Sequence, residues 1–482
     1  MEMLIGGQRR KAHDGKVIEV TNPATGEVVD TIPLATADDV SEAVSNAVAG
    51  QRKWAAYPLH ERAAILRRFI NSIDEHIDEL ALLQTKEMGK PIRESRGDFG
   101  SLKMLFNGYI EAANNMFGHT MPLGVQSGMD RDLEFTIFEP LGVIACIISF
   151  NAPLVLFTHK VAPSLIAGNS VIVKPASDDP LALLRIGELL WEAGVPGDAL
   201  QFVTGSGSKV GGWLTADPRI NKITFTGSTD VGIEIAQTCA KNLTHVSLEL
   251  GGNAPFVIMD DADIDRAVEE AVSRRAAYVT GQICNAAKRF LVHRSRKDEF
   301  RCKLVARLQK LVIGNPEDPM TQVGTLISEK AAKEVEMQVA HTVSQGARLV
   351  YGGQRSGAFY IPAVLDDVTA EMDIAHNLEV FGPVFPMIVF DTLEEAIALS
   401  NDTIYGLGAG IMTSDMKAAM RYAMRVQSGS VIINGQSAYR TGQMPFGGYK
   451  KSGIGREGYT ASLLEVTQSK SIVFKDMIPS DH

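Results

Sequence analysis

The chain has 482 residues, and a length of this order favours two or three domains over a single hydrophobic core. Hydrophobic residues make up 45% of the chain and charged residues 22%, as in a globular protein. The formal net charge is -10 and no basic stripe is present, which argues against a nucleic acid partner.

The N-terminal stretch and the most apolar run do not predict export or a membrane span. MEMLIGGQRRKAHDG lacks the apolar segment of a signal peptide. The run LGVIACIISFNAPLVLF is interrupted by Asn151 and Pro153, and it is shorter than the roughly 20 residues that cross a bilayer. We therefore expect a cytoplasmic protein with no membrane partner.

The first third of the chain is predicted to be mainly helical. From residue 36 to 87, apolar residues recur every three or four positions behind a capping threonine and two aspartates. Residues 102–117 continue this pattern as another helix. The stretch DRDLEFTIFEP then alternates, which predicts a strand or hairpin within residues 121–139.

Short apolar strands alternate with helices from residue 142 onwards. Strands are predicted over 142–149, 169–175, 199–205, 222–227 and 244–252, with helices over 159–168, 181–194 and 229–242. The second half repeats this alternation. Strands are predicted over 253–261, 288–293, 385–390 and 429–434, and helices over 262–279 and 297–312. This alternation predicts an α/β protein with doubly wound parallel sheets.

Two glycine-rich turns follow strands, where open parallel sheets bind ligands. VTGSGSKVGG holds Gly207 and Gly211, and FTGSTDVG holds Gly227 and Ser228 just before a helix that starts at Thr229 or Asp230. The free N–H groups at a helix start suit a phosphate. Neither turn has the GxGxxG spacing, so an ordinary turn is the alternative for each.

The four cysteines are far apart and contain no CxxC pair, so we expect neither a disulfide framework nor a metal site. Cys146 lies in a strand, where it is expected to be core, and Cys239 and Cys302 lie in helices, where packing is expected. Cys284 lies among small residues in VTGQICNAAKRF, where a helix is expected to stop. It is either a packing residue or a nucleophile.

Several motifs in one order then resemble the aldehyde dehydrogenase superfamily, over about residues 5–475. They are EPLGVIACIISFNAPL, NSVIVKPA, FTGSTDVG, LELGG, GQIC, EVFGPV and MPFGGYKKSGIGREG. The resemblance implies that Cys284 is the nucleophile, Glu249 the general base and Asn151 the oxyanion donor. It implies a cofactor, NAD or NADP, bound by Ile148, Ser149, Lys174, Ser177, Gly207, Gly211, Phe225, Gly227, Ser228, Val231, Leu250, Glu379 and Phe381.

Three positions depart from the family pattern. Phe150 stands where tryptophan is usual, and Ser149 where proline is usual. Ser177 stands where an acid commonly binds the adenosine ribose. The last departure predicts that NADP is used at least as well as NAD, because the acid's repulsion of a 2′-phosphate is missing.

The resemblance also implies a domain plan and an assembly. Residues 1–121 and 141–251 are expected to form the NAD(P)-binding domain, and residues 252–452 the catalytic domain. Residues 122–140 and 465–482 are expected to bridge to a neighbouring subunit in a homodimer or homotetramer.

The residues present predict the oxidation of an aldehyde to its acid through a thiohemiacetal and a thioester on Cys284, which water then hydrolyses. Nearby amides are expected to lower the pKa of the thiol, and burial is expected to raise that of Glu249. The late segment INGQSAYRTGQMPFGG resembles that of relatives that act on small hydroxylated or anionic aldehydes. The resemblance therefore implies a small hydroxy- or semialdehyde as substrate, with His159 and Arg440 as candidate contacts. A hydrogen-bonded helix residue and an exposed loop arginine are the alternatives for these two.

Three other functions stay open. One is an aromatic aldehyde dehydrogenase, because FNAPL also resembles relatives that take aromatic aldehydes. Another is a CoA-acylating semialdehyde dehydrogenase, although such relatives tend to lack the base at Glu249. The last is a binding protein on the same fold, which would not need Cys284, Asn151 and Glu249 together.

Overall fold

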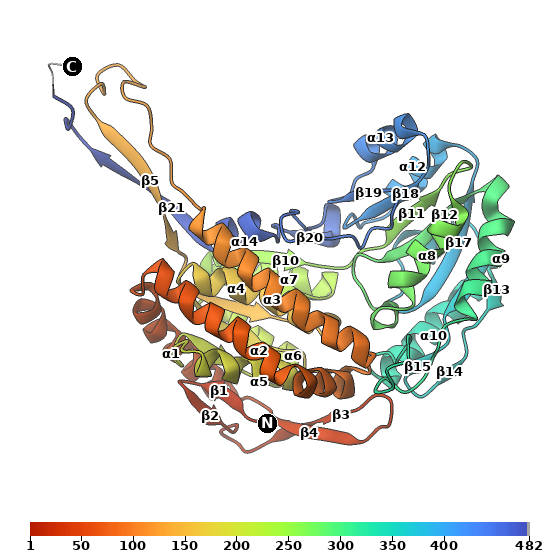
Figure 1. Ribbon diagram of the computed structural model, residues 1–482, viewed down its shortest axis with the longest axis horizontal. Helices are drawn as coiled ribbons and strands as arrows, with labels where there is room; N and C mark the ends of the chain where they lie inside the picture. Colours follow the sequence, from red (N-terminus) through yellow and green to blue (C-terminus); the bar gives the residue numbers. More distant parts are fainter. Residues whose placement is uncertain (480–482) are drawn as a thin grey trace.

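The computed structural model describes residues 1–479, which form two α/β lobes and a projecting two-stranded arm (Figure 1). The first lobe is built on an eight-stranded sheet. Its order is β2 (Gln8–Arg10), β1 (Met3–Ile5), β8 (Leu200–Phe202), β7 (Ser170–Lys174), β6 (Val143–Ile147), β9 (Lys222–Thr226), β10 (His245–Glu249) and β20 (Gly453–Ile454). The strands from β8 to β10 are parallel. At the edges, β1 is antiparallel to β8, β2 is antiparallel to β1, and β20 is antiparallel to β10.

Helices cover both faces of this sheet because its central strands are apolar on both sides. In β6, Ile144 and Cys146 enter one core, while Val143, Ala145 and Ile147 enter the other. The first core is closed by α2 (Leu59–Met88), α3 (Ile92–Asn114), α4 (Pro153–Ile166), α5 (Leu181–Glu192) and α14 (Tyr459–Glu465). The second is closed by α1 (Ala37–Ala55), α6 (Gly207–Ala216) and α7 (Thr229–Cys239). The doubly wound sheet predicted from the sequence is confirmed.

The second lobe repeats this plan on a seven-stranded sheet. Its order is β13 (Arg348–Tyr351), β16 (Ala363–Val368), β17 (Val384–Phe390), β12 (Ala287–His293), β11 (Ala254–Ile258), β18 (Ala409–Met412) and β19 (Val431–Ile433), and only β13 is antiparallel to its neighbour. One face packs against α8 (Ile264–Arg275) and α9 (Lys297–Leu308). The other packs against α10 (Glu329–Ser344), α11 (Asp373–His376), α12 (Leu393–Asn401) and α13 (Met416–Arg425).

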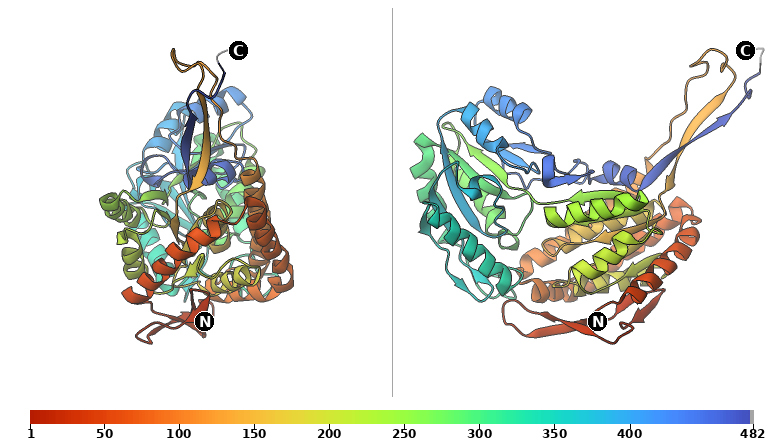
Figure 2. Two further views of the ribbon diagram at one scale, coloured as in Figure 1. Left: turned by 90° about the vertical axis from the view of Figure 1, so that its left-hand side faces the viewer. Right: turned by 180° about the vertical axis from the view of Figure 1, so that it is seen from behind.

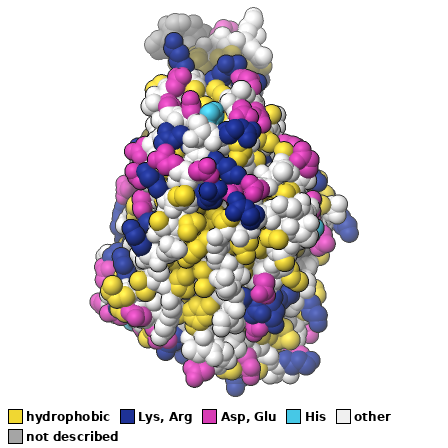
Figure 3. All heavy atoms as spheres, turned by 90° about the vertical axis from the view of Figure 1, so that its right-hand side faces the viewer, with side chains coloured by type: hydrophobic (Ala, Val, Ile, Leu, Met, Phe, Trp, Pro, Cys, Tyr) yellow, Lys and Arg dark blue, Asp and Glu magenta, His cyan; other side chains and the backbone are white. Residues whose placement is uncertain are grey.

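Smaller elements complete the lobes. They are the strand pairs β3 (Val17–Thr21) with β4 (Val28–Pro33) and β14 (Arg355–Ser356) with β15 (Phe359–Tyr360), and the 3₁₀ turns η1 (Ala240–Asn242), η2 (Val279–Gly281), η3 (Arg294–Arg296) and η4 (Lys450–Ser452). On the outer face of the second lobe, acidic and basic side chains are interspersed around a band of hydrophobic ones (Figure 3).

The arm pairs β5 (Leu133–Pro140) with β21 (Thr467–Phe474) in antiparallel register, and it extends away from both lobes (Figures 1 and 2). The predicted bridging segment 465–482 therefore forms one strand of the arm, and its residues 480–482 lie outside the described residues. Within residues 1–479, no helix combines the length and the apolar character needed to cross a membrane.

Several details of the sequence prediction were wrong. The helix expected over 159–168 spans Pro153–Ile166, and the helix expected over 297–312 ends at Leu308. The helix expected over 102–117 already begins at Ile92, behind Pro91. The glycine turn at 205–211 continues into α6, because Ser206 caps that helix by accepting from the N–H of Lys209. The helix expected over 262–279 ends at Arg275. Cys302 is exposed rather than packed, because it lies off the buried stripe of α9 formed by Phe300, Leu304 and Leu308.

Candidate active site

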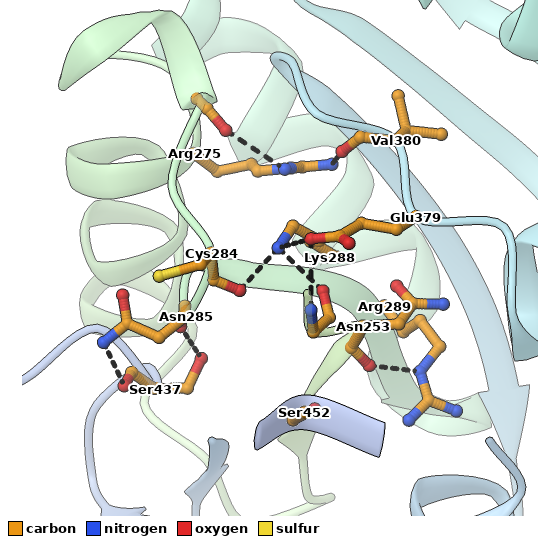
Figure 4. A network of polar contacts seen from close by, with 12 residues as sticks. Asn253, Arg275, Cys284, Asn285, Lys288, Arg289, Glu379, Val380, Ser437 and Ser452 are labelled. Atoms are coloured by element: carbon orange, nitrogen blue, oxygen red, sulfur yellow. Dashed lines mark hydrogen bonds and ion pairs between the residues drawn. The ribbon is translucent and has the colours of Figure 1, made fainter. Parts of the chain in front are cut away.

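A tight turn between α8 and β12 presents Cys284. Val279, Thr280 and Gly281 all have positive φ, and a Cβ at Gly281 would lie 2.4 Å from the carbonyl oxygen of Arg275. Only glycine fits this approach without strain. The buried Arg275 guanidinium donates to the carbonyls of Gly281 and Val380, at 3.3 and 3.0 Å, and so fixes the turn (Figure 4).

Cys284 and Asn151 line the same cavity, which has a volume of about 250 Å³. Asn151 precedes α4, which places its amide beside the thiol segment. The hydroxyl of Ser149 donates to Asn151 Oδ1 at 2.6 Å, so the amide nitrogen is left to donate into the cavity. Ser149, which stands where proline is usual, thus contacts the Asn151 side chain directly.

Glu249 ends β10, where its backbone is held between Thr226 of β9 and Gly453 of β20. Its side chain is buried, and Oε2 has no hydrogen-bond partner among the described residues. Burial raises the pKa of Glu249 well above its usual value, and the nearby charge of Glu457 raises it further. The expected upward shift is confirmed, so the carboxyl stays protonated to a higher pH than an exposed glutamate does.

The thiol of Cys284 does not have the lowered pKa expected from the sequence. Burial raises the pKa of Cys284 to about 11, and the charge of Lys288 lowers it only in part. Glu249 and Glu379 raise it further. Desolvation outweighs the nearby amides, so the structure describes a protonated thiol that needs a base.

The thirteen predicted cofactor residues all line one of two adjoining cavities, which share Thr226 and Ser228. Ser149, Gly227, Ser228, Leu250, Glu379 and Phe381 line the cavity of Cys284. Ile148, Lys174, Ser177, Gly207, Gly211, Phe225, Ser228 and Val231 line a second cavity of about 450 Å³. Two joined cavities meeting at the N-terminus of α7 suit a molecule with two nucleoside halves and a central pyrophosphate.

The second cavity has an unusual charge pattern. The hydroxyl of Ser177 donates to the carbonyl of Gly205 at 2.8 Å. Lys174 donates to the carbonyl of Pro175, and burial lowers the pKa of Lys174 to about 8. Asp178 and Glu234 also line this cavity, and the charges of Asp179 and Asp178 partly offset the effect of burial on Lys174.

Glu379 projects into the cavity of Cys284 from the segment before β17 (Figure 4). Its Oε1 accepts from the N–H of Gly252 at 3.2 Å and from the ammonium of Lys288 at 2.8 Å. Sequence reasoning missed Lys288 as a site residue. The available signal was a lysine inside the apolar strand KRFLVH, four residues after the cysteine.

The two predicted substrate contacts lie in a buried polar cluster. His159 Nδ1 is 2.7 Å from the hydroxyl of Tyr109, and burial lowers the pKa of His159 well below its usual value. This contact fits the reading of His159 as a hydrogen-bonded helix residue. His159 is not among the described residues that line the Cys284 cavity.

Arg440 is also largely buried, so the alternative of an exposed loop arginine is wrong. Its guanidinium lies 3.0 Å from Glu457 and stacks over Phe446, with its centre 4.0 Å from the ring centroid. Glu457 also pairs with Lys160 at 2.6 Å. Burial alone would raise the pKa of Glu457, but Lys160 and Arg440 lower it well below the usual range.

Comparisons with known proteins agree with this geometry. The model of the family described as "Aldehyde dehydrogenase family" matches residues 10–472. The chain is 38% identical to a 3-sulfolactaldehyde dehydrogenase of Priestia aryabhattai, over 95% of this chain and 94% of that protein. It is 39% identical to the NADP(+) succinate-semialdehyde dehydrogenase of Escherichia coli K12, with the same coverage.

A solved structure of similar fold is the succinate-semialdehyde dehydrogenase from Burkholderia pseudomallei. It shares 36% sequence identity and a TM-score of 0.95, over 98% of both chains. Matches of this length and identity show both the fold and the family. The chain therefore belongs to the aldehyde dehydrogenase family, the enzymes that oxidise aldehydes with NAD or NADP.

Proposed function

We propose that the chain oxidises a short anionic aldehyde to its carboxylate by a hydrolytic mechanism on Cys284. The observation that carries the mechanism is the cavity that Cys284 and Asn151 share. Glu249 is buried, and its Oε2 has no hydrogen-bond partner among the described residues. A nucleophile, an oxyanion donor and a base are the three groups that this chemistry needs.

In this proposal Glu249, once ionised, takes the proton of the Cys284 thiol, directly or through water. The thiolate adds to the carbonyl carbon and forms a thiohemiacetal, whose oxyanion accepts hydrogen bonds from the Asn151 amide and the Cys284 N–H. Donors of this kind contribute about 3–4 kcal/mol each. Nicotinamide, when bound, would supply the hydride acceptor. Once Glu249 has released the thiol proton to solvent, its carboxylate activates the water that hydrolyses the Cys284 thioester.

The two cavities are proposed to hold the cofactor through the thirteen residues that line them. Glu379 and Lys174 would each contact one ribose, and Gly227 and Ser228 the pyrophosphate. The free backbone N–H groups at the start of α7 support the last assignment, because helix N-termini bind phosphate.

Both NAD and NADP are expected to be used, with NADP at least comparable in kcat/KM. Ser177 is neutral and already donates to Gly205, so no acid stands at the ribose-binding position. Ser177→Glu restores like-charge opposition to a 2′-phosphate and is expected to shift the kcat/KM ratio towards NAD by about tenfold or more. Ser208→Glu, elsewhere in the same cavity, is the control for added charge. A wild type limited to NAD, or an unchanged ratio in Ser177→Glu, would contradict this assignment.

Charge in the buried cluster supports an anionic substrate. Lys160 and Arg440 both pair with Glu457, and the charges of the two cations also act on Glu249, so the cluster carries one excess positive charge while Glu249 is protonated. Arg440 Nε is buried and has no hydrogen-bond partner among the described residues. Its charge also acts on Cys284, so it lies within electrostatic range of the thiol. The substrates named for the two relatives, succinate semialdehyde and 3-sulfolactaldehyde, are short aldehydes that carry an anionic group.

Arg440→Gln is expected to lower kcat/KM for succinate semialdehyde by about 10²-fold, the cost of losing a hydrogen bond to a charged group. The kcat/KM for butyraldehyde, which has no anion, should change by less than about threefold. Measuring both substrates on the wild type and the variant decides the role of Arg440. Equal losses for the two aldehydes would show that Arg440 only supports the local structure.

One assay separates the remaining functions. Formation of reduced cofactor is followed with succinate semialdehyde, lactaldehyde and benzaldehyde, each with and without CoA. The proposal predicts the fastest turnover with an anionic or hydroxylated aldehyde and no need for CoA. A CoA requirement would indicate the acylating class, preference for benzaldehyde the aromatic class, and no turnover with any aldehyde a binding protein.

We also propose that each lobe has its own function. Residues 1–121 and 141–251 bind the cofactor, and residues 252–452 complete the catalytic site. The predicted cytoplasmic location stays a prediction from the sequence.

The arm is proposed to pair with a second copy of the chain, giving a dimer or a dimer of dimers. The pair β5–β21 extends away from both lobes, and Val473 and Phe474 on it are half exposed. The chain mass is 52.1 kDa, so light scattering is expected to give at least twice that value at micromolar concentration. Replacing Val473 and Phe474 by glutamate should weaken the association. A wild-type monomer would contradict the proposal.

A further inference from the structure

Lys288 connects three parts of the site with a single ammonium group. It lies in β12, and its side chain is 1% exposed. Its Nζ donates to the carbonyl of Cys284 at 2.6 Å, to the carbonyl of Gly252 at 2.7 Å and to Oε1 of Glu379 at 2.8 Å (Figure 4). An ammonium has three N–H donors, so all of them are used.

The three acceptors belong to the segments that carry the proposed chemistry. The first acceptor is the carbonyl of Cys284, the residue that carries the thiol. Gly252 follows Glu249 by three residues, on the segment that leads out of β10. Glu379 lines the same cavity as the thiol. A shift of the Lys288 ammonium would therefore move the base segment, the nucleophile and the cofactor-facing carboxylate together.

The neighbouring buried cations do not have this role. Arg275 and Arg289 are also fully buried, and their hydrogen bonds go to main-chain carbonyls. They fix loops around the site. Lys288 alone of the three forms an ion pair with a carboxylate in the cavity.

The two carboxylate oxygens of Glu379 have different surroundings. Oε1 accepts from both Lys288 and the N–H of Gly252. A Cβ at Gly251 would come within 2.3 Å of Oε2, so this close approach requires glycine. Lys288 and the two glycines thus determine which oxygen of Glu379 is left to accept from a ribose hydroxyl.

The same two charges act on the thiol in opposite directions. The positive charge of Lys288 lowers the pKa of Cys284, and the negative charge of Glu379 raises it. Changing either charge should therefore change the thiolate fraction at a given pH, with opposite signs.

We infer that Lys288 is a positioning residue that fixes Glu379 against the cofactor ribose and sets the thiolate fraction of Cys284. The inference rests on the roles proposed above for Cys284 and Glu379. It adds Lys288 as the residue that holds the Cys284 and Glu379 side chains in their relative positions.

The test compares Lys288→Met, Glu379→Gln and Lys222→Met with the wild type. Lys222 is a matched control, because it is a buried lysine paired with Glu465 at the amino end of β9. Full-length protein without cofactor is alkylated with iodoacetamide across neutral to alkaline pH. The carbamidomethylated Cys284 peptide is quantified by mass spectrometry, so no turnover is needed.

Lys288→Met is expected to slow alkylation of Cys284 by about tenfold below its pKa, the effect of a shift of one pKa unit. Glu379→Gln should accelerate alkylation, and Lys222→Met should leave the pH profile unchanged. Both Lys288→Met and Glu379→Gln should raise the KM for the cofactor. If Lys288→Met does not fold, Lys288→Gln, which also removes the charge, is measured in its place.

An unchanged profile in Lys288→Met, or slower alkylation in both variants, would overturn the inference and leave Lys288 a purely structural residue. Failure of the proposed mechanism is distinguishable from this result. It would appear as retained turnover in Cys284→Ala, whatever the alkylation rates of the Lys288 and Glu379 variants.

Discussion

Cys284→Ala is expected to lower aldehyde dehydrogenase turnover by on the order of 10⁴-fold or more, the usual cost of removing a covalent nucleophile. Cys284 is the cysteine that lines the cavity with Asn151, whereas Cys146 and Cys239 are buried in the first lobe. Affinity for the cofactor should stay within about threefold of wild type, because the lost thiol is not an anchoring group. Steady-state assays and calorimetric titration measure the two effects.

Cys302→Ser is the matched control for this prediction. Cys302 is exposed on α9, so its replacement should leave turnover unchanged. Steady cofactor reduction by Cys284→Ala at the wild-type rate would remove Cys284 from the mechanism. Loss of cofactor binding in the same variant would indicate a damaged site instead of a missing nucleophile.

Glu249→Gln is expected to lower kcat by about 10²–10⁴-fold, the usual contribution of a general base. The loss should fall mainly on hydrolysis of the thioester, since attack by water needs a base more than attack by a thiol does. A pre-steady-state burst of reduced cofactor should therefore remain, at a lower rate than in the wild type because the Cys284 thiol also loses its base. Stopped-flow absorbance followed by steady-state rates separates the two steps.

The pH profile gives Glu249 an independent signature. Burial and the charge of Glu457 raise the pKa of Glu249, and the carboxylate is the active form of the base. The rate of wild-type deacylation should thus fall about tenfold per unit as the pH drops below this raised pKa. In Glu249→Gln this limb should vanish, and it should persist in Glu465→Gln, whose carboxylate pairs with Lys222 and Ser247. Loss of the burst together with normal thioester hydrolysis in Glu249→Gln would contradict the role proposed for Glu249.

The sequence predicted the two sheets well because their strands are buried on both faces. A run such as GVIACIIS leaves few alternatives once helices flank it, and β6 is paired on both sides by parallel strands. It predicted α6 poorly. Gly207, Gly211 and Gly212 lower helix propensity, yet the cap from Ser206 and the packing of Val210 and Leu214 outweigh this cost.

The motifs named the residues of the candidate site, but they could not predict its electrostatics. Motif order placed Cys284, Glu249 and Asn151, and the fold brings the first and the last into one cavity. The raised pKa of Cys284 depends on how much protein surrounds the thiol, which no motif specifies. Lys288 was missed for the same reason. In the sequence it is a lysine in a strand, and only tertiary contacts direct its ammonium to Glu379.

The most direct test of the mechanism is to trap the acyl-enzyme. Glu249→Gln is mixed with succinate semialdehyde and NADP, quenched in acid within one turnover and digested for peptide mass spectrometry. The account predicts a succinyl adduct on the Cys284 peptide, formed in a yield equal to the burst and absent from Cys284→Ala. Reduced cofactor produced without any adduct on Cys284, or an adduct on another residue that forms at the same rate, would contradict it.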